Sequence, residues 1–401
     1  MSDAMGIRPA ARTRDITYAV RDIVVLAQEV AASGRQMLYL NIGDPNQFDF
    51  RTPDHIIEAT HRAMRENYNG YSPSSGIPGA LQAIEAQAER KGIVNILDIF
   101  VTSGVSEAID VCFTALVDAG ENIMIPTPVY PLYSAVLNKL GARPNPYFLD
   151  EDKGWQPDVN DIREKIDGQT RGLVLINPNN PTGSVCSEET LQEIVELARQ
   201  HNLVIFADEI YDQLILEDRQ HRSIAALDPD LSVITFNGLS KAYLVPGWRI
   251  GWGVASGNRK NMALYLEAVN KLLRARLCAN HPEQYAIAPA LEGNQEHLQQ
   301  MKAKLIRRRD LTTNMLNDIP GISCVKPEGA FYAFPRLEID GSDWDFVRAL
   351  IRETGVVVVP GGGFGQRPGS QHFRVVFLPP EQILERAYDQ IGRFLQTYAA
   401  S

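Results

Sequence analysis

Residues 171–211 read RGLVLINPNNPTGSVCSEETLQEIVELARQHNLVIFADEIY, and their pattern decides the fold class. The runs LVLI and LVIFA are almost entirely apolar, which is typical of strands buried on both faces. Between them, Leu191, Ile194 and Val195 recur at helical spacing, and Ser187 precedes them as a candidate N-cap. A strand, a helix and a strand in such short order predict a βαβ unit, whose two strands are parallel.

The same alternation continues on both sides of this unit. Upstream, DIFVTSG (98–104) and ENIMIPTP (121–128) read as strands on either side of a helix within residues 106–120. Downstream, VITF (233–236) reads as another buried strand. We therefore expect an α/β fold in which a mostly parallel sheet is flanked by helices.

The end of the chain has the pattern of a smaller α+β domain. A long charged helix is predicted over residues 295–316, followed by three strand-like runs, GISCV, AFYAFP and HFRVVFL, and by helices near 344–353 and 380–398. Near the start, a helix at 20–32 precedes the short strand in LYLNIGDP. The predicted division is an N-terminal arm (1–45) that packs with the small domain, a large domain (46–290) and a small C-terminal domain (291–401).

The composition is that of a globular protein and disfavours two kinds of partner. The 401 residues are 44% hydrophobic and 22% charged, and the formal net charge of −10 argues against nucleic acid. No apolar run is long enough to span a bilayer, so we expect no membrane partner, and residues 1–15 lack the apolar core of a signal peptide. The cysteines are far apart and the histidines have no ligand spacing, so we expect free thiols, no metal site and a cytoplasmic location.

Polar side chains follow four of the predicted strands, at the edge where open α/β sheets bind ligands. Ser106 opens the helix after DIFV, Asn180 follows LVLI, and Asp208 ends LVIFA with Tyr211 shortly after it. Lys241 follows VITF. A helix start, an amide, a carboxylate with a phenol, and an amine are complementary in chemistry, which indicates a built site.

These groups suit a phosphorylated pyridine aldehyde. A lysine amine forms a Schiff base with the aldehyde. A carboxylate opposite the ring nitrogen keeps that nitrogen protonated, so that the ring can accept electrons. A phenol and an amide can hydrogen-bond the phenolate oxygen of the ring, while a helix N-terminus and an arginine can bind the phosphate.

Each of these residues also has a purely structural interpretation. Lys241 by itself would be a solvated surface lysine. Asp208 could cap a helix, and Asn180 could serve only its Pro-rich turn. The matched set favours the functional interpretation over the separate structural ones.

Other candidates and motifs have simple alternatives too. Tyr130 in PTPVYPLY and Tyr71 in GYSPSSG could merely pack, and Arg374 inside FRVVF could form a structural ion pair. GGGFG (361–365) looks like a dinucleotide loop but lacks the following helix and acidic residue, so we expect a flexible turn. The basic run KAKLIRRRD (302–310) is predicted to be a solvated helix face.

Taken together, the blocks NPNNPTG, ADEIY, SKAY, PGWRIGW, PEGAFYAF and FRVVF resemble, in this order, the fold-type-I pyridoxal-phosphate-dependent aminotransferases of class I/II. The resemblance covers nearly the whole chain. Within that family, NGLSKAYLVPGWRIGW and RLCANHPEQYAIAPAL are most similar to the bacterial alanine aminotransferases. The resemblance implies the type I fold of pyridoxal-phosphate enzymes, pyridoxal 5'-phosphate as cofactor, and transamination.

By position, the resemblance also assigns roles around the ring. It implies that Lys241 is the catalytic Schiff-base lysine and later shuttles the proton, and that Asp208 pairs with the pyridinium nitrogen. Tyr211 and Asn180 would bind the phenolate oxygen, and Tyr130 would stack on the ring face.

At the phosphate, the resemblance implies contacts from the helix start at Val105 and Ser106 and from the charge of Arg249. Tyr71 would reach the phosphate of the neighbouring subunit's site. Many relatives carry serine three residues before the lysine, where it binds the phosphate, but this chain has Gly238. Either Ser240 takes over that role or the phosphate loses one side-chain donor.

For the substrate, the resemblance implies that Arg374 holds the α-carboxylate with a two-pronged hydrogen bond, assisted by Asn180. Gly43 would let the backbone approach that carboxylate closely. The implied reaction is L-alanine with 2-oxoglutarate giving pyruvate and L-glutamate, with ping-pong kinetics, in a homodimer with shared active sites.

Three alternatives remain open. The amino donor could instead be aromatic, branched-chain or aspartate, or the enzyme could be a pyridoxal-phosphate-dependent C–S β-lyase. A pyridoxal-phosphate-binding regulatory protein belongs to a different class. Such regulators carry an added DNA-binding domain, for which we expect the short N-terminal region to leave no room.

Overall fold

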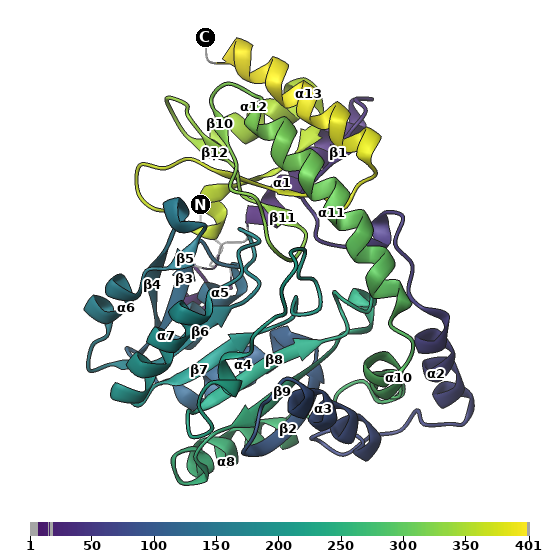
Figure 1. Cartoon of the computed structure of the whole chain (residues 1–401), viewed down its shortest axis with the longest axis vertical. Helices are drawn as coiled ribbons and strands as arrows, with labels where there is room; N and C mark the ends of the chain where they lie inside the picture. The colour runs from purple at the N-terminus through teal and green to yellow at the C-terminus, as the bar shows by residue number, and fades with distance from the viewer. Residues whose placement is uncertain (1–6, 15, 17–18, 399–401) are drawn as a thin grey trace, which may run out of the picture.

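The centre of the molecule is an eight-stranded sheet (Figure 1). The computed structural model describes residues 7–14, 16 and 19–398. Neighbouring strands of the sheet are parallel, except that the second strand in spatial order and the last are antiparallel to their neighbours. In spatial order the strands are β2 (Ile96–Ser103), β9 (Ile250–Ser256), β8 (Val233–Gly238), β7 (Val204–Asp208), β6 (Thr170–Ile176), β3 (Asn122–Thr127), β4 (Arg143–Asp150) and β5 (Gln156–Pro157).

The βαβ unit predicted from the sequence is present. β6 and β7 pair in parallel, with Ile176 opposite Asp208, and α7 (Glu188–Gln200) connects them. Ser187 is the N-cap of α7, since its hydroxyl oxygen accepts a 3.1 Å hydrogen bond from the amide of Thr190. The predicted α/β fold with a mostly parallel sheet is therefore confirmed.

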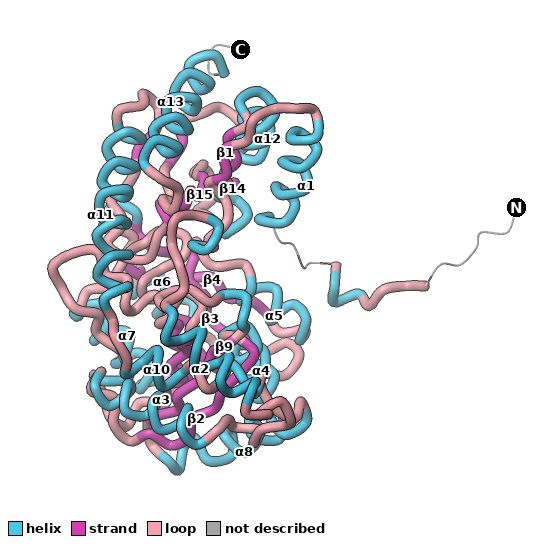
Figure 2. The backbone as a smooth tube through the Cα atoms, turned by 90° about the vertical axis from the view of Figure 1, so that its right-hand side faces the viewer, coloured by secondary structure: helices cyan, strands magenta, loops and turns pink. Residues whose placement is uncertain are grey.

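Helices cover both faces of this sheet, which gives the large unit three layers (Figures 1 and 2). Successive residues of β6 alternate between two cores: Leu173 and Leu175 belong to one, Val174 and Ile176 to the other. The first core includes α2 (Asp54–Arg65), α3 (Pro78–Arg90), α6 (Val159–Lys165), α7 and α10 (Ile287–Glu292), with α9 (His281–Gln284) beside α2; the second includes α4 (Val105–Leu116), α5 (Leu132–Leu140) and α8 (Arg259–Ala275).

A smaller unit of short strands and long helices stands above the sheet in the view of Figure 1. Its strand pairs are β1 (Leu38–Tyr39) with β13 (Val356–Val357), β10 (Ile322–Ser323) with β12 (Arg336–Leu337), and β15 (Phe373–Val376) between β11 (Tyr332–Ala333) and β14 (Val359–Pro360). Its helices are α1 (Ala19–Ala32), α11 (Glu296–Asn317), α12 (Asp343–Thr354) and α13 (Glu381–Tyr398).

The N-terminal segment joins this smaller unit through strand pairing. β1 lies parallel to β13, and α1 packs against α12. The exact boundaries of the arm and of the two domains stay predictions, and residues 1–6, 15 and 17–18 of the arm lie outside the described part of the chain. The remaining elements are short 3-10 turns: η1 (Ala11–Thr13), η2 (Pro45–Gln47), η3 (Glu151–Lys153), η4 (Ile224–Ala226), η5 (Pro246–Trp248) and η6 (Gly361–Phe364).

The prediction of a solvated basic face at 302–310 was wrong for two arginines on α11. Arg308 and Arg309 are only 2% and 3% exposed. Nη2 of Arg308 lies 2.8 Å from Oδ2 of Asp49, and Nη1 of Arg309 lies 2.7 Å from Oε1 of Glu217. These carboxylates come from segments far away in sequence, so nothing in the local charge pattern could reveal that α11 would bury two of its cations.

The predicted turn at GGGFG (361–365) is present, and it is closely packed; its flexibility stays a prediction. The segment forms the 3-10 turn η6, and Phe364 is buried. The carbonyl oxygen of Phe364 accepts a 2.8 Å hydrogen bond from the amide of Val129, and the amide of Gly361 donates at 2.8 Å to the carbonyl of His372. The glycines allow η6 to pack closely against its neighbours from both units.

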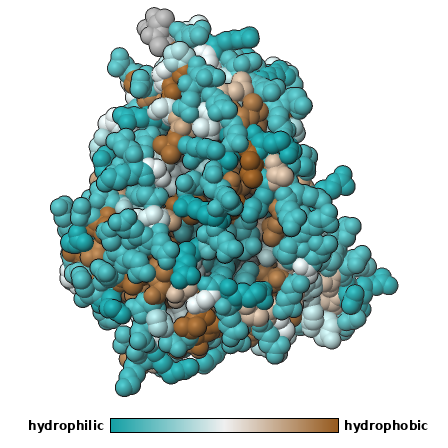
Figure 3. Space-filling model, in the orientation of Figure 1, coloured by the Kyte–Doolittle hydropathy of each residue, from teal (hydrophilic) through white to brown (hydrophobic). Residues whose placement is uncertain are grey.

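The face of the molecule shown in Figure 3 is largely hydrophilic, with apolar residues in scattered groups. Among the residues that the structure describes, no helix is both long and apolar enough to cross a membrane. Within the same ranges, no group of three or more His, Cys, Asp or Glu side chains is placed to hold a metal ion.

Candidate active site

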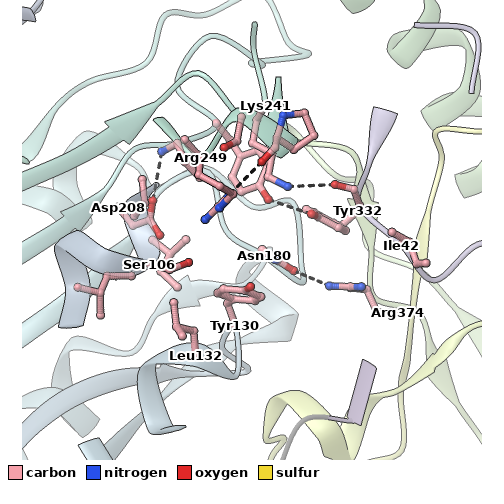
Figure 4. Close-up of a pocket in the computed structure, with 18 of the residues that line it drawn as sticks. Ile42, Ser106, Tyr130, Leu132, Asn180, Asp208, Lys241, Arg249, Tyr332 and Arg374 are labelled. Carbon is pink, nitrogen blue, oxygen red and sulfur yellow. Dashed lines mark hydrogen bonds between the residues drawn. The ribbon is translucent and has the colours of Figure 1, made fainter. Parts of the chain in front are cut away.

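A cavity of about 440 Å³ lies where the carboxyl ends of the sheet strands meet the smaller unit (Figure 4). It brings together segments from the N-terminal region, the large sheet and the C-terminal strands. Its lining includes eleven of the twelve candidate site residues, the exception being Tyr71. These eleven are Gly43, Val105, Ser106, Tyr130, Asn180, Asp208, Tyr211, Ser240, Lys241, Arg249 and Arg374.

Lys241 follows β8 and reaches across the cavity towards the N-terminal segment. Its Nζ donates a 3.0 Å hydrogen bond to the carbonyl oxygen of Gly43. Burial lowers the pKa of Lys241 to about 8; the charge of Asp44 opposes this shift, and Arg374 and Arg249 add to it. The amine is therefore held close to the pKa at which it can accept and release a proton near neutral pH.

Asp208 ends β7 deep in the cavity and is 6% exposed. Burial raises the pKa of Asp208 to about 6, and a hydrogen bond from Tyr133 limits the rise. A buried carboxylate that is still ionised near pH 7 can pair with a protonated ring nitrogen. Tyr211 lies on the following turn, and its hydroxyl is 2.9 Å from that of Tyr332.

One end of the cavity has the features of an anion site. Gly104 is the N-cap of α4 and provides no side-chain acceptor for the first amides of that helix, where Val105 and Ser106 line the cavity. Arg249 has a φ of 55°, and a Cβ on Gly104 would lie 2.8 Å from its Cζ. Ser240 lines the same cavity.

The close approach of two backbone segments explains why position 238 is a glycine. Gly238 pairs with Gly251 across β8 and β9. A Cβ at position 238 would lie 2.7 Å from the carbonyl oxygen of Ile250 and 2.9 Å from Cα of Gly251. This close approach of two strands leaves no room for a serine side chain, which explains the departure from the pattern of many relatives.

The opposite end of the cavity has the features of a carboxylate site. Arg374 on β15 is 3% exposed; its Nη1 donates to Oδ1 of Asn180 at 3.1 Å, and its Nη2 donates to the carbonyl of Asn41 at 2.7 Å. Its guanidinium also lies 4.8 Å from the ring centre of Tyr332 and 4.6 Å from that of Phe364. Arg374 is thereby fixed by groups from three distant segments of the chain.

Tyr130 and Tyr71, which could both have served only for packing, lie in different places. Tyr130 lines the cavity, within reach of a planar ligand (Figure 4). Tyr71 is 82% exposed and does not line the cavity of its own chain. A role for Tyr71 in a site therefore requires a second subunit.

Several residues of the site were not identified from the sequence. Tyr133 bonds Asp208, Tyr332 occupies the space next to Gly43, and Phe364 packs under Arg374. Tyr133 could have been suspected because it follows Tyr130 by three residues at a helix start. The contacts of the other two depend on how the smaller unit is placed over the sheet, for which the sequence carries no local signal.

The arrangement fits a phosphorylated pyridine aldehyde. The anion site at the start of α4 and the guanidinium of Arg249 suit the phosphate, and the amine of Lys241 suits the aldehyde. Asp208 suits the ring nitrogen, and Arg374 remains for a carboxylate of a second ligand. The cavity thus offers complementary groups to each part of such a cofactor.

The profile of the family "Aminotransferase class I and II" matches residues 35–391. The chain belongs to this family. It is 41% identical to the glutamate-pyruvate aminotransferase AlaA of Escherichia coli (strain K12), with 98% of each chain covered, and 41% identical to an alanine aminotransferase of Mycobacterium bovis, with 97% and 92% covered. An alanine aminotransferase structure from Pyrococcus furiosus superposes with a TM-score of 0.94 at 41% identity, covering 97% of this chain and 100% of that one.

These likenesses confirm the predicted fold and the predicted class of enzyme. The aminotransferase has the type I fold of pyridoxal-phosphate enzymes, and the family implies that it uses this cofactor with an amino acid and a 2-oxo acid as substrates.

Proposed function

We propose that this aminotransferase transfers the amino group between L-alanine and 2-oxoglutarate, giving pyruvate and L-glutamate, with pyridoxal phosphate held at Lys241. One observation carries the proposed chemistry: Lys241, Asp208 and Arg374 line a single cavity. The choice of alanine is supported by the names of relatives that are 41% identical over nearly their full lengths.

Lys241 is the proposed attachment point for the aldehyde and the proposed acid and base. When bound, pyridoxal phosphate supplies an electron-accepting ring that stabilises negative charge at the α-carbon of the substrate. With a pKa of about 8, the amine of Lys241 would remove the proton from that α-carbon and donate one to the carbon that carried the aldehyde, without a large cost in either direction. Asp208, ionised above about pH 6, holds the ring nitrogen protonated.

The residues at the two ends of the cavity have binding roles, one end for the substrate carboxylate and the other for the cofactor phosphate. Arg374 binds the substrate α-carboxylate with two parallel hydrogen bonds and orients the α-carbon towards Lys241. Val105, Ser106 and Arg249 bind the phosphate, with Ser240 as a further donor. Tyr130 stacks on the face of the ring, and Tyr211 and Asn180 bind its phenolate oxygen.

The apolar part of the lining supports a small aliphatic side chain. Ile42, Leu132 and Ile109 line the cavity alongside the polar groups. An aromatic, branched-chain or acidic amino donor, or a C–S β-lyase reaction, remains an outcome of the test below. A regulatory protein that only binds the cofactor would form the bound species without turnover.

We also propose a homodimer with shared active sites, in the cytoplasm. Tyr71 lies outside its own cavity on an exposed loop, as expected of a residue that completes the phosphate site of a second subunit. The four free cysteines favour a reducing compartment. Analytical ultracentrifugation and the cofactor affinity of a Tyr71→Phe variant test the dimer, since a monomer with full cofactor affinity would contradict it.

The decisive experiment is the visible absorption spectrum of the purified protein with pyridoxal phosphate. We expect a bound-cofactor band that L-alanine bleaches and 2-oxoglutarate restores, and ping-pong kinetics with the pair. Lys241→Ala should fold but lose turnover by at least about 10³-fold. A band indifferent to alanine would reject the substrate, and ammonia with pyruvate from a cysteine conjugate would favour the lyase. Near-normal turnover of Lys241→Ala would reject the mechanism.

A further inference from the structure

A buried ion cluster adjoins the strand end that carries Asp208. Lys91, just after α3, lies with its Nζ 3.0 Å from Oε2 of Glu209 and also pairs with Asp212. The side chains of both carboxylates are 2% exposed, and that of Lys91 is 15% exposed. None of these three residues lines the cavity, and the proposed mechanism does not use them.

Glu209 is fixed at every polar atom. Its amide donates to the carbonyl of Phe236 at 2.9 Å, and its carbonyl accepts from Nδ2 of Asn237 at 3.0 Å. Its Oε1 accepts a 2.6 Å hydrogen bond from Ser223, and its Oε2 pairs with Lys91. Because Glu209 directly follows Asp208, these contacts determine where the strand end places the Asp208 carboxylate.

The balance of charge in the cluster depends on Lys91. Two carboxylates, Glu209 and Asp212, pair with one cation, Lys91. Nδ1 of His221 is 4.0 Å from Oε2 of Glu209, and Tyr243 lies within the influence of Asp212. Four further cations line a neighbouring cavity together with Lys91 and Asp212, namely Arg90, Arg219, Arg222 and Lys302. On the cavity side, Asp208 itself is faced by Tyr133 from α5, Lys241 from the segment after β8, and Tyr211 from its own turn.

We propose that Lys91 is a positioning residue: by neutralising Glu209 and Asp212 it keeps the neighbouring Asp208 in place and ionised for the ring nitrogen of the cofactor. The proposal rests on the proposed function, since it assumes that Asp208 pairs with that nitrogen. Lys91 would act without touching the cofactor or the substrate.

The electrostatics of the buried groups agree with this role. Burial lowers the pKa of Lys91, but the charges of Asp212 and Glu209 outweigh that effect, so its pKa is raised and it stays protonated. The pKa of Asp208 is raised first by burial and also by the negative charge of Glu209. Without Lys91, the uncompensated charge of Glu209 would act on Asp208 at full strength in a medium of low dielectric constant.

Two substitutions with opposite expected signs test the proposal. Lys91→Met removes the cation, so Asp208 should be neutral at higher pH and hold the cofactor more weakly. Glu209→Gln removes the nearest negative charge, so Asp208 should ionise at lower pH and hold it more strongly. Arg90→Met is the matched control, because Arg90 is the adjacent cation and lines a cavity with Asp212, but its side chain hydrogen-bonds the carbonyl of Leu291.

The measurement is the dissociation constant of pyridoxal phosphate by equilibrium dialysis between about pH 6 and pH 8, relative to the wild-type protein at each pH. For Lys91→Met we expect binding weakened by at least about tenfold near pH 6, with the deficit shrinking as pH rises and Asp208 ionises. Glu209→Gln should bind more tightly near pH 6, and Arg90→Met should match the wild type. Lys91→Arg, which keeps the charge, should restore the wild-type curve.

The outcomes separate this proposal from the proposed function. A wild-type protein that binds no pyridoxal phosphate at any pH would reject the function itself. A wild-type protein that binds it, with Lys91→Met and Glu209→Gln shifted in the same direction or by a factor independent of pH, would overturn the role of Lys91, because packing damage behaves in that way. If Lys91→Met does not fold, Glu209→Gln decides: unchanged or weaker binding near pH 6 contradicts the proposal.

Discussion

The hydroxyl of Tyr133 donates a 2.7 Å hydrogen bond to Oδ2 of Asp208, with both side chains buried. Burial alone would favour the neutral acid, and Tyr133 supplies the largest effect that opposes it. The pKa of Tyr133 is itself raised well above its usual value by burial and by the charge of Asp208, so the proton stays on the phenol. This hydrogen bond lets a buried carboxylate remain ionised near neutral pH.

Tyr133→Phe should weaken cofactor binding by about 10- to 100-fold, because a hydrogen bond to a buried charge contributes roughly 1.5–3 kcal/mol. The loss should be greatest at low pH, since the pKa of Asp208 would rise further once its donor is gone. The measurement is the dissociation constant of pyridoxal phosphate between about pH 6 and pH 8.

Tyr147→Phe is the control for Tyr133→Phe. Tyr147 is equally buried, but its hydroxyl bonds the carbonyl of Val174 inside the core of the sheet. It should lose stability without losing cofactor affinity. Equal losses of affinity in the two variants would show that Tyr133 acts only through packing.

Asp208→Asn should make the cofactor-free protein more stable while abolishing function. The folded pKa of about 6 lies above the ordinary value of 3.8, so the native state binds more protons between these values. Stability therefore falls as pH rises through this window, and the full penalty, roughly 1–3 kcal/mol, persists above pH 6. Denaturant unfolding of the cofactor-free wild type and of cofactor-free Asp208→Asn at neutral pH measures this difference in the free energy of unfolding. A variant less stable than the wild type would contradict this account.

The sequence contained enough local information for the central sheet and for most of the site. Apolar strands with a helix between them require a parallel pair, and polar residues that end such strands, such as Asn180, Asp208 and Lys241, must meet at one edge. Their periodicity and order are local properties of the chain. The fold and the family followed from these patterns.

Contacts between remote segments could not be predicted in this way. Arg308 looked like a solvated cation on a helix, because its carboxylate partner Asp49 comes from a distant part of the chain. Tyr332 enters the site only because β11 lies over the cavity. At Gly238 the sequence left open whether Ser240 replaces a phosphate donor, and it gave no sign that two strands approach closely at this position.

Arg308→Met should destabilise the protein by about 2–5 kcal/mol. It removes the buried partner of Asp49 and Glu381 and leaves the carbonyl of Leu378 without its 2.5 Å donor. Burial alone would raise the pKa of Asp49, but hydrogen bonds from Arg308 and Lys304 lower it to about 2. The ionised Asp49 therefore contributes to stability above pH 3.8, and this contribution is lost as the pH falls towards 2. The partial exposure of Asp49 to solvent makes the contribution smaller.

The neighbouring Arg307 provides the matched control. Its side chain is 62% exposed, and its contact with Glu381 is 3.6 Å long, so Arg307→Met should change the free energy of unfolding by less than about 1 kcal/mol. Urea denaturation of both variants measures the difference. Similar values for the two would mean that the buried position of Arg308 contributes nothing to stability.

Gly238→Ser tests whether the missing phosphate donor can simply be restored. A side chain at this position would press on Ile250 and Gly251 of the adjacent strand, at distances below those of ordinary van der Waals contact. We therefore expect a loss of about 1–3 kcal/mol in the free energy of unfolding and no gain in cofactor affinity. Thermal denaturation and the dissociation constant of pyridoxal phosphate are the two measurements.

Gly79→Ser separates the effect of close packing from that of replacing any glycine. Gly79 is exposed on α3 and has nothing within 4 Å of an added Cβ, so this change should be neutral or slightly stabilising. A Gly238→Ser variant that is as stable as Gly79→Ser and binds the cofactor more tightly would show that β8 and β9 can separate to admit the hydroxyl. In that case the packing of β8 against β9 would not require a glycine at position 238, and Gly238 would simply deprive the phosphate of one donor.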